Sequence, residues 1–142
     1  MPLVSASNAI LTVLMVEDSL AVRQAMRAAF EGIPGVRVVG EAEDARRAMR
    51  LLRELRPDVL TLDVRLKESY GTEVLRELAK DQMPKKPVIM ILTNHVNPYV
   101  RSAFRDLGAD HFLDKATEFG TACGILERLV AERRNGEARH GS

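Results

Sequence analysis

The sequence predicts an α/β fold: a doubly wound, five-stranded parallel sheet with helices on both faces. Five short apolar runs alternate with helical patterns along the chain. Each run is mostly β-branched or aliphatic, as in strands that are buried on both faces of a parallel sheet. Parallel neighbours require crossover helices, and such crossovers are right-handed. We therefore expect the strand order 2-1-3-4-5, with its switch point between the first and third strands.

The five strands are short runs rich in β-branched and aliphatic residues. They are expected at Leu11 to Val16, Val36 to Gly40, Val59 to Leu62, Val88 to Leu92 and His111 to Asp114. Each is bounded by turn or cap residues, such as the Pro34-Gly35 turn before the second run. Their lengths suit strands better than helices.

Five helices are predicted in the intervals between and after the strands. The expected ranges are Ser19 to Gly32, Asp44 to Leu55, Gly71 to about Gln82, Pro98 to Leu107, and Thr117 to Arg134. Apolar residues recur at helical spacing, which predicts one buried face for each helix. The first helix should bury Val22, Ala25, Met26, Ala29 and Ile33, and the last Phe119, Cys123, Leu126 and Val130. Gly108 should cap the fourth helix.

Length and composition favour one domain of ordinary type. The chain has 142 residues, of which 46% are hydrophobic, so it can bury one core of its own. We expect this domain over 11–134, between an N-terminal tail (1–10) and a C-terminal tail (135–142), with no output domain attached. A net charge of +1 gives no reason to expect direct nucleic-acid binding. No run is long enough for membrane insertion, which favours a cytoplasmic location.

Polar residues follow four of the five strands where each ends. Glu17, Asp18, Asp63, Thr93 and Lys115 hold these positions. The carboxyl ends of parallel strands meet at one edge of the sheet, so these groups should form one pocket. Clustered carboxylates need a cation, and hard oxygen ligands in a hydrated site suit Mg²⁺.

This pocket predicts phosphoryl transfer to a carboxylate. Asp63 stands alone at a strand end and is the expected nucleophile, forming an aspartyl phosphate. Glu17 and Asp18 are the expected metal ligands, together with Asp63 and the backbone carbonyl of Arg65. Thr93 should donate its hydroxyl to a phosphate oxygen, and Lys115 should neutralise the charge that develops there.

These elements together resemble the receiver domain of the two-component response-regulator family, in its stand-alone form. The resemblance covers about Leu11 to Arg134, through the acidic pair, Asp63 followed by Gly71, Thr93, and the segment from Gly108 to Lys115. It implies the flavodoxin-like topology and a phosphorelay role, with Asp63 as phosphoacceptor and Mg²⁺ as cofactor. It also implies that Thr93 and Phe112 form a switch, in which Thr93 moves inward and Phe112 fills the vacated space.

The resemblance further implies the partners of the chain. A sensor histidine kinase or histidine phosphotransfer protein would donate the phosphoryl group, and an unknown downstream protein would read the changed surface. A homodimer is left open. Arg65, Asn94 and His95 occupy positions that tune the phosphate lifetime in this family. Ala116 replaces a common proline, and we expect a trans Lys115–Ala116 bond because cis costs roughly 2.5–4 kcal/mol.

Three alternatives compete with a signalling receiver. A degenerate receiver would act as a protein-interaction module without phosphorylation, and Asn94 beside Thr93 leaves room for that reading. A Mg²⁺-dependent phosphatase of the haloacid-dehalogenase type needs a second acid two residues after the nucleophile, where this chain has Arg65. An FMN binder of the same topology would hold a phosphate at the first loop, where Glu17 and Asp18 would repel it.

Overall fold

A parallel sheet of five strands forms the centre of the molecule, in the order β2-β1-β3-β6-β7. The computed structural model describes residues 10–141, with side chains as far as residue 136. The strands are β1 (Leu11–Val16), β2 (Val36–Ala42), β3 (Val59–Leu62), β6 (Val88–Thr93) and β7 (His111–Asp114). The predicted order 2-1-3-4-5 is confirmed, because β6 and β7 are the fourth and fifth strands of this sheet.

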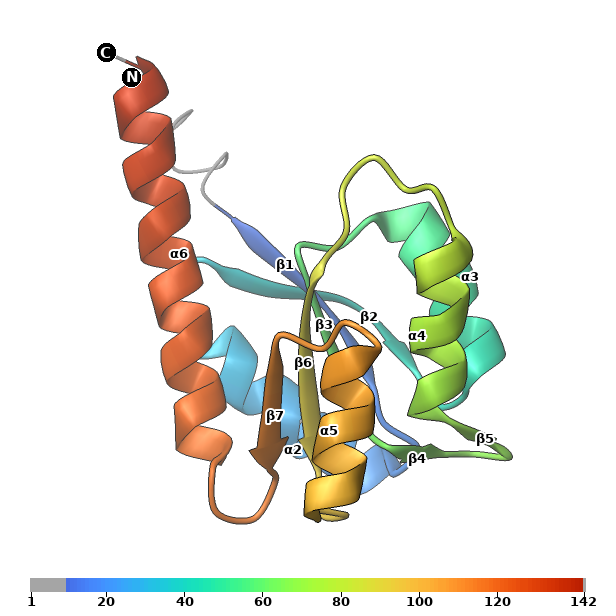
Figure 1. Cartoon of the computed structure of the whole chain (residues 1–142). Helices are drawn as coiled ribbons and strands as arrows, with labels where there is room; N and C mark the ends of the chain where they lie inside the picture. The colour runs from blue at the N-terminus through green and yellow to red at the C-terminus, as the bar shows by residue number, and fades with distance from the viewer. Residues whose placement is uncertain (1–9, 142) are drawn as a thin grey trace.

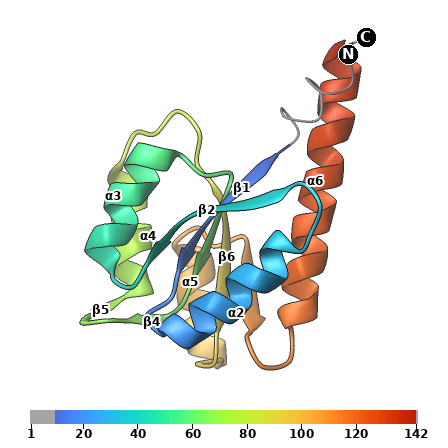
Figure 2. The same cartoon turned by 180° about the vertical axis from the view of Figure 1, so that it is seen from behind.

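Helices cover both faces of the sheet (Figure 1). One face carries α2 (Leu20–Glu31) and α6 (Phe119–Gly141), and the other carries α3 (Ala45–Leu55), α4 (Gly71–Lys80) and α5 (Pro98–Asp106), as the reverse view also shows (Figure 2). Successive side chains of a strand point to opposite faces. Leu60 accordingly packs in the core beneath α3, α4 and α5, and its neighbour Val59 in the core beneath α2 and α6.

Three of the helices have an N-cap residue whose side chain accepts a hydrogen bond from the first turn. Ser19, Asp44 and Asn97 each accept a hydrogen bond from the backbone N–H three residues on, at 3.3, 2.8 and 2.9 Å. Such caps satisfy amides that the helix itself leaves unpaired. At the other end of α5, Gly108 has a φ of 106°, which confirms the predicted glycine cap.

The buried face of α2 differs from the predicted one. Met26 is buried as predicted, but Ala25 and Ala29 are exposed, and Phe30, which was not predicted, is buried. A methyl group gains little from burial, so the larger side chains decide how the helix is turned. In α6, Leu126 and Val130 are buried as predicted, whereas the Phe119 and Cys123 side chains are only partly buried and lie at the margin of the core.

The last helix continues to Gly141, beyond the predicted end at Arg134. Arg133 lies 2.7 Å from the Asp58 carboxylate, which fixes this part of the helix against the sheet. The helix continues past the edge of the sheet (Figure 1) through a mixed segment, in which Glu137, Ala138 and Arg139 favour a helix and Asn135 and Gly136 do not. The predicted tail over residues 1–10 lies almost wholly outside the described residues. None of the described helices is long and apolar enough to cross a membrane.

A short hairpin follows β3 that the sequence did not predict. Strands β4 (Arg65–Leu66) and β5 (Ser69–Tyr70) pair antiparallel, and Glu68 in the turn has a φ of 51°. Two-residue strands are too short to produce a recognisable hydrophobic pattern. The hairpin carries the chain from Asp63 to the start of α4.

Candidate functional site

The sheet itself gathers the predicted site residues at the carboxyl ends of its strands. Three backbone hydrogen bonds extend the strand pairing into the site. Glu17 N–H donates to Ala42 at 2.9 Å, Asp63 N–H to Val16 at 3.1 Å, and Lys115 N–H to Thr93 at 2.9 Å. Each site residue is thereby held to a neighbouring strand rather than left on a free loop. This edge is the lower one in Figure 1, where β7 points downward.

Lys115 joins the two buried acids of this edge. Its Nζ donates to Asp63 Oδ2 at 2.8 Å and also to Glu17 Oε1. Glu17 is 3% and Asp63 8% exposed, so both carboxylates are largely removed from water. Asp63 Oδ1 also accepts the Val64 N–H at 2.6 Å. One ammonium group therefore compensates two buried carboxylates from strands far apart in the sequence.

Burial and hydrogen bonding act in opposite directions on the pKa values of Glu17 and Lys115. Burial raises the pKa of the Glu17 carboxyl above its ordinary value, although hydrogen bonds from Lys115 and the Ser19 N–H oppose the rise, and the neighbouring Asp18 adds to it. Burial lowers the pKa of Lys115, but its hydrogen bonds to Asp63 and Glu17 outweigh this and leave that pKa raised. The carboxylates of Glu17 and Asp63 together carry more negative charge than the single ammonium of Lys115 can neutralise.

Asp18 completes the acidic pair, but it is exposed. Within the described part of the chain, no three Asp, Glu, His or Cys side chains stand together as a ready-made metal cage. Mg²⁺ needs only one or two protein carboxylates, because it keeps several of its waters. The donor chemistry at Glu17, Asp18 and Asp63 fits this ion, since their carboxylates outnumber the Lys115 ammonium beside them and a cation would compensate the remaining negative charge. Arg65, whose carbonyl was the fourth predicted ligand, opens β4 with its side chain exposed.

Thr93 ends β6 in a fully buried position, with 0% exposure. Its Oγ1 accepts the His95 N–H at 3.0 Å, so the hydroxyl contacts the loop that leads to α5. Asn94 and His95 are exposed on that loop. The side chain of Thr93 is thus placed between the acidic pocket and the β6–α5 loop.

Phe112 of β7 is already buried, with 8% exposure. Its ring lies 6.1 Å from that of Phe104 in α5, and the Arg101 guanidinium lies 5.0 Å from the ring centre. Arg101 Nη1 also donates to the Phe112 carbonyl at 3.1 Å. The expectation that Phe112 moves inward on activation therefore does not fit this conformation, in which its ring already fills the interior. No pattern in the sequence distinguishes Arg101 as a partner of Phe112.

Gly71 is a second residue whose contribution only the structure reveals. Its N–H donates to the Val64 carbonyl at 2.8 Å. A Cβ at this position would lie far inside van der Waals contact of the Asp63 carbonyl oxygen and 3.2 Å from the Phe104 ring. Only glycine allows α4 to begin this close to Asp63. A glycine eight residues after the strand-end acid was the available sequence signal.

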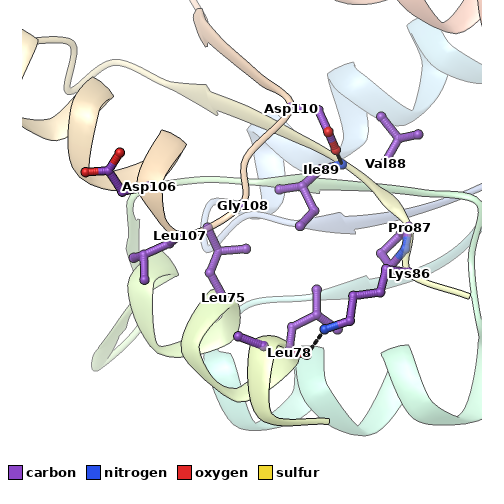
Figure 3. Close-up of a pocket in the computed structure, with 11 residues that line it drawn as sticks. Leu75, Leu78, Lys86, Pro87, Val88, Ile89, Asp106, Leu107, Gly108 and Asp110 are labelled. Carbon is purple, nitrogen blue, oxygen red and sulfur yellow. Dashed lines mark hydrogen bonds between the residues drawn. The ribbon is translucent and has the colours of Figure 1, made fainter. Parts of the chain in front are cut away.

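A hollow at the opposite end of the sheet is separate from this pocket (Figure 3). It measures about 560 Å³ and lies between α4, α5 and the start of β6. Asp110 accepts the Ile89 N–H at 2.8 Å, and Lys86 Nζ donates to the Leu78 carbonyl at 2.6 Å. These polar groups are satisfied within the protein, so they do not form a second reactive centre.

The predicted trans bond between Lys115 and Ala116 is confirmed, because the described residues contain no cis peptide.

Comparison with known proteins shows which protein family this chain resembles. The model for the response regulator receiver domain matches residues 13–126. A protein-glutamate methylesterase/protein-glutamine glutaminase of Alkalilimnicola ehrlichii is 35% identical over 118 residues, which cover 82% of this chain and 29% of that protein. The transcriptional regulatory protein YdfI of Bacillus subtilis is 33% identical, over 83% of this chain and 54% of that protein. The chain thus spans from under a third to about half of the length of these relatives.

Solved structures agree with this assignment. A two-component response regulator of the LuxR family from an Aurantimonas species is 30% identical, with a TM-score of 0.78 and 88% of each chain covered. The response regulator domain of Thermotoga maritima CheB is 25% identical, with a TM-score of 0.71, covering 89% of this chain and 97% of that one. Both align over nearly the whole described fold.

Proposed function

The chain belongs to the family of response regulator receiver domains, and on this basis we propose that it accepts a phosphoryl group on Asp63. The donor is the phosphohistidine of a sensor histidine kinase or of a histidine phosphotransfer protein. The observation that carries the proposal is the position of Lys115, whose ammonium contacts both Asp63 and Glu17 at one edge of the sheet. Thr93 lies on the adjacent strand, at the same edge.

The geometry supports Asp63 as the nucleophile. A carboxylate oxygen of Asp63 attacks the phosphorus of the donor, so that a P–O bond forms while the P–N bond of the phosphohistidine breaks. Lys115 is already within hydrogen-bond distance of Asp63 Oδ2, where it can neutralise charge on the transferred oxygens. Mg²⁺, held by Glu17, Asp18, Asp63 and the Arg65 carbonyl, would supply further charge compensation for the phosphoryl oxygens.

Thr93 and Phe112 are proposed to carry the signal from this site to the surface. Phosphorylation adds roughly −1.5 to −2 charge and three acceptor oxygens. The Thr93 hydroxyl then gains an acceptor for its proton, and the β6–α5 loop shifts with it because Thr93 Oγ1 accepts the His95 N–H. Because Phe112 is already buried, phosphorylation would stabilise this arrangement within an existing equilibrium rather than create it. Arg101, which contacts both the ring and the carbonyl of Phe112, belongs to the same coupled unit.

The output is proposed to be protein binding through the surface of α5, β7 and the start of α6. Asn94 and His95, with Arg65, flank the pocket on exposed loops and are proposed to set the lifetime of the phosphate. The named relatives include a methylesterase and a transcriptional regulatory protein, so the receiver in this chain is proposed to control a regulatory output of that general kind. Whether it works as a homodimer is testable by size measurement with and without phosphate.

Phosphorylation with acetyl phosphate and Mg²⁺ tests the proposal directly. Intact-mass analysis should show one added phosphate on the wild type and none on Asp63→Asn. Asp58→Asn is the matched control, because Asp58 is also a largely buried acid beside a lysine, but it lies before β3 rather than after it. It should accept phosphate like the wild type.

Two other outcomes would redirect the proposal. A wild type that never takes up phosphate would favour the degenerate receiver that acts by binding alone. Equal labelling of Asp63→Asn and wild type would place the acceptor elsewhere. The phosphatase alternative lacks support at residue 65, where the exposed arginine replaces the second acid that it requires.

A further inference from the structure

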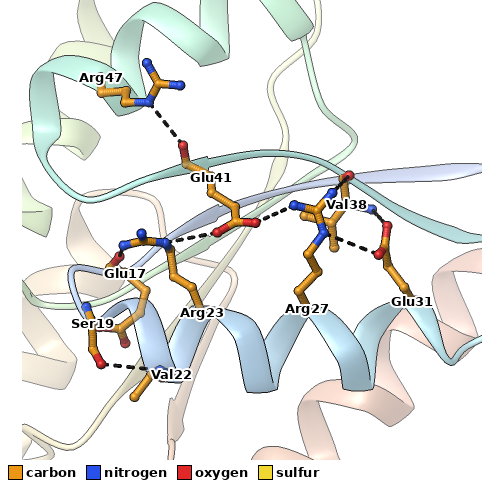
Figure 4. A network of polar contacts seen from close by, with 9 residues as sticks. All are labelled: Glu17, Ser19, Val22, Arg23, Arg27, Glu31, Val38, Glu41 and Arg47. Atoms are coloured by element: carbon orange, nitrogen blue, oxygen red, sulfur yellow. Dashed lines mark hydrogen bonds and ion pairs between the residues drawn. The ribbon is translucent and has the colours of Figure 1, made fainter.

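We propose that Arg23 is a positioning residue for the acidic pair Glu17 and Asp18, and that Glu41 holds it in that role. The inference rests on the proposed function, because the acidic pair is the proposed Mg²⁺ site. Arg23 contacts no reacting group, and its action is on the backbone of Glu17. Figure 4 shows the polar network to which it belongs.

The guanidinium of Arg23 connects the loop after β1 to the end of β2. Its Nη1 donates to the Glu17 carbonyl at 2.7 Å, and its Nε donates to Glu41 Oε1 at 3.0 Å. The Arg23 side chain is 13% and the Glu41 side chain 24% exposed, so water competes only weakly for these hydrogen bonds. Arg23 lies in the first turn of α2, one turn beyond the acids that it holds (Figure 4).

The contact fixes the peptide unit that joins the two acids. The Glu17 carbonyl belongs to the same planar peptide as the Asp18 nitrogen, so a hydrogen bond to that oxygen restricts the orientation of both residues. The Ser19 N–H donates to Glu17 Oε2 at 2.9 Å and the Glu17 N–H to Ala42 at 2.9 Å. Ser19 is held in turn as the cap of α2, where its Oγ accepts the Val22 N–H at 3.3 Å. Among the described residues, Arg23 adds a donor to the carbonyl that links the two acids.

Glu41 keeps Arg23 in place and pairs with its positive charge. Its second carboxylate oxygen accepts from Arg27, and its backbone carbonyl accepts from Arg47 Nε at 3.3 Å. Glu41 is therefore anchored from α2 and α3 together (Figure 4). Because the charge of Arg23 is paired with that of Glu41, its effect on the acidic pair is mainly geometric. Groups that orient ligands in this way commonly change metal affinity 10–100-fold when they are removed.

Mg²⁺ titration of the unphosphorylated protein tests this role. Amide chemical shifts of residues 16–20 report binding in wild type, Arg23→Ala and Arg27→Ala. Arg27 is the matched control, because it pairs with the same Glu41 from the same helix but does not contact Glu17. We expect about tenfold weaker Mg²⁺ binding for Arg23→Ala and a change below about twofold for Arg27→Ala. The variant Asp18→Ala, which removes a proposed ligand, calibrates the full loss.

A second readout separates positioning from general loosening of the fold. Phosphorylation of Arg23→Ala by acetyl phosphate should approach the wild-type rate at saturating Mg²⁺ and fall behind only at low Mg²⁺. If Arg23→Ala does not fold, Glu41→Gln replaces it, with an expected loss of about threefold in Mg²⁺ affinity. Unchanged affinity in the folded Arg23 or Glu41 variant, or an equal loss in Arg27→Ala, would overturn the inference. A wild type that binds Mg²⁺ but takes no phosphate would instead contradict the proposed function alone.

Discussion

Strand β3 has a largely buried aspartate at each end, and the two are held in opposite ways. Asp63, after the strand, shares the ammonium of Lys115 with Glu17. Asp58, before the strand, accepts from Thr12 N–H at 2.8 Å, from Arg133 at 2.7 Å and from Lys85 at 2.9 Å. One end has two carboxylates for one cation, and the other has two cations for one carboxylate.

The difference appears in the protonation equilibria. Burial works to raise the pKa of Asp58, but hydrogen bonds from Arg133, Thr12 and Lys85 lower it to about 2. At the other end, burial raises the pKa of Glu17 despite Lys115. The Asp58 end is therefore arranged for stability, and the Asp63 end keeps unsatisfied negative charge that an added cation would relieve. A folded protein tolerates such tension at one site only because other contacts stabilise it.

The largest expected effect on stability comes from the close packing of Gly71 against the Asp63 backbone. This packing stabilises the Asp63 end of β3, where charge pairing is less favourable than at the Asp58 end. Gly71→Ala should lower the free energy of unfolding by about 3 kcal/mol, because its Cβ would overlap the Asp63 carbonyl and crowd Phe104. Urea unfolding measures the change. Gly124→Ala in α6, where a Cβ has open space, should instead be neutral or slightly stabilising. Equal effects of the two substitutions would mean that close packing does not support the Asp63 end.

A reciprocal pair of substitutions tests the comparison itself. Asp58→Asn should lower the free energy of unfolding by about 2 kcal/mol, because Arg133 and Lys85 lose their shared anion. Asp63→Asn should change it by less than about 1 kcal/mol, since Lys115 keeps Glu17 as its partner. Chemical unfolding at neutral pH provides both values. A larger loss for Asp63→Asn would reverse the assignment of the two ends.

The pH dependence of stability should show the same asymmetry. Because the pKa of Asp58 falls from 3.8 to about 2 on folding, its ionised form stabilises the protein above pH 4. This contribution, about 2 kcal/mol, should be lost as the pH falls from about 4 to about 2. Thermal unfolding across that range should be steeper in pH for wild type than for Asp58→Asn. Parallel profiles would show that Asp58 does not contribute this slope.

The smallest effect separates the two cations that pair with Asp58. The Lys85 side chain is 69% exposed, so Lys85→Ala should cost no more than a few tenths of a kcal/mol, roughly the value of an exposed pair. Arg133 is 31% exposed and joins α6 to the sheet, so Arg133→Ala should cost about 1 kcal/mol. Unfolding of both variants in low and high salt distinguishes them. If Lys85→Ala proved the more costly, α6 would not depend on this ion pair.

Most of the fold was readable from the sequence because its signals are local. The apolar runs of β3 and β7 and the cap residues Ser19 and Asp44 each identify an element without knowledge of any distant contact. Strict alternation of strands and helices then leaves few topologies, and the predicted one is observed. The strand-end positions of Glu17, Asp63 and Lys115 likewise predicted a shared edge, which the structure contains.

Where the sequence prediction failed, the deciding contact lies far away in the chain. The face of α2 depends on which side chains fill the core best, and the Arg133–Asp58 pair that holds α6 joins residues on opposite sides of the chain's midpoint. The strands of the β4–β5 hairpin have two residues each, too few to show the alternation of apolar and polar residues by which a strand is recognised.

The local pattern of the chain establishes which residues end each strand and therefore which groups reach the pocket. How those groups share charge depends on the packing of distant segments. Lys115 and Glu17 are 98 residues apart, and Arg23 reaches Glu41 from another element. Such contacts follow from sheet order, side-chain direction and the packing of helices on the sheet. Local periodicity carries no information on the direction of an individual hydrogen bond, because the same hydrophobic pattern is compatible with many arrangements of the polar atoms.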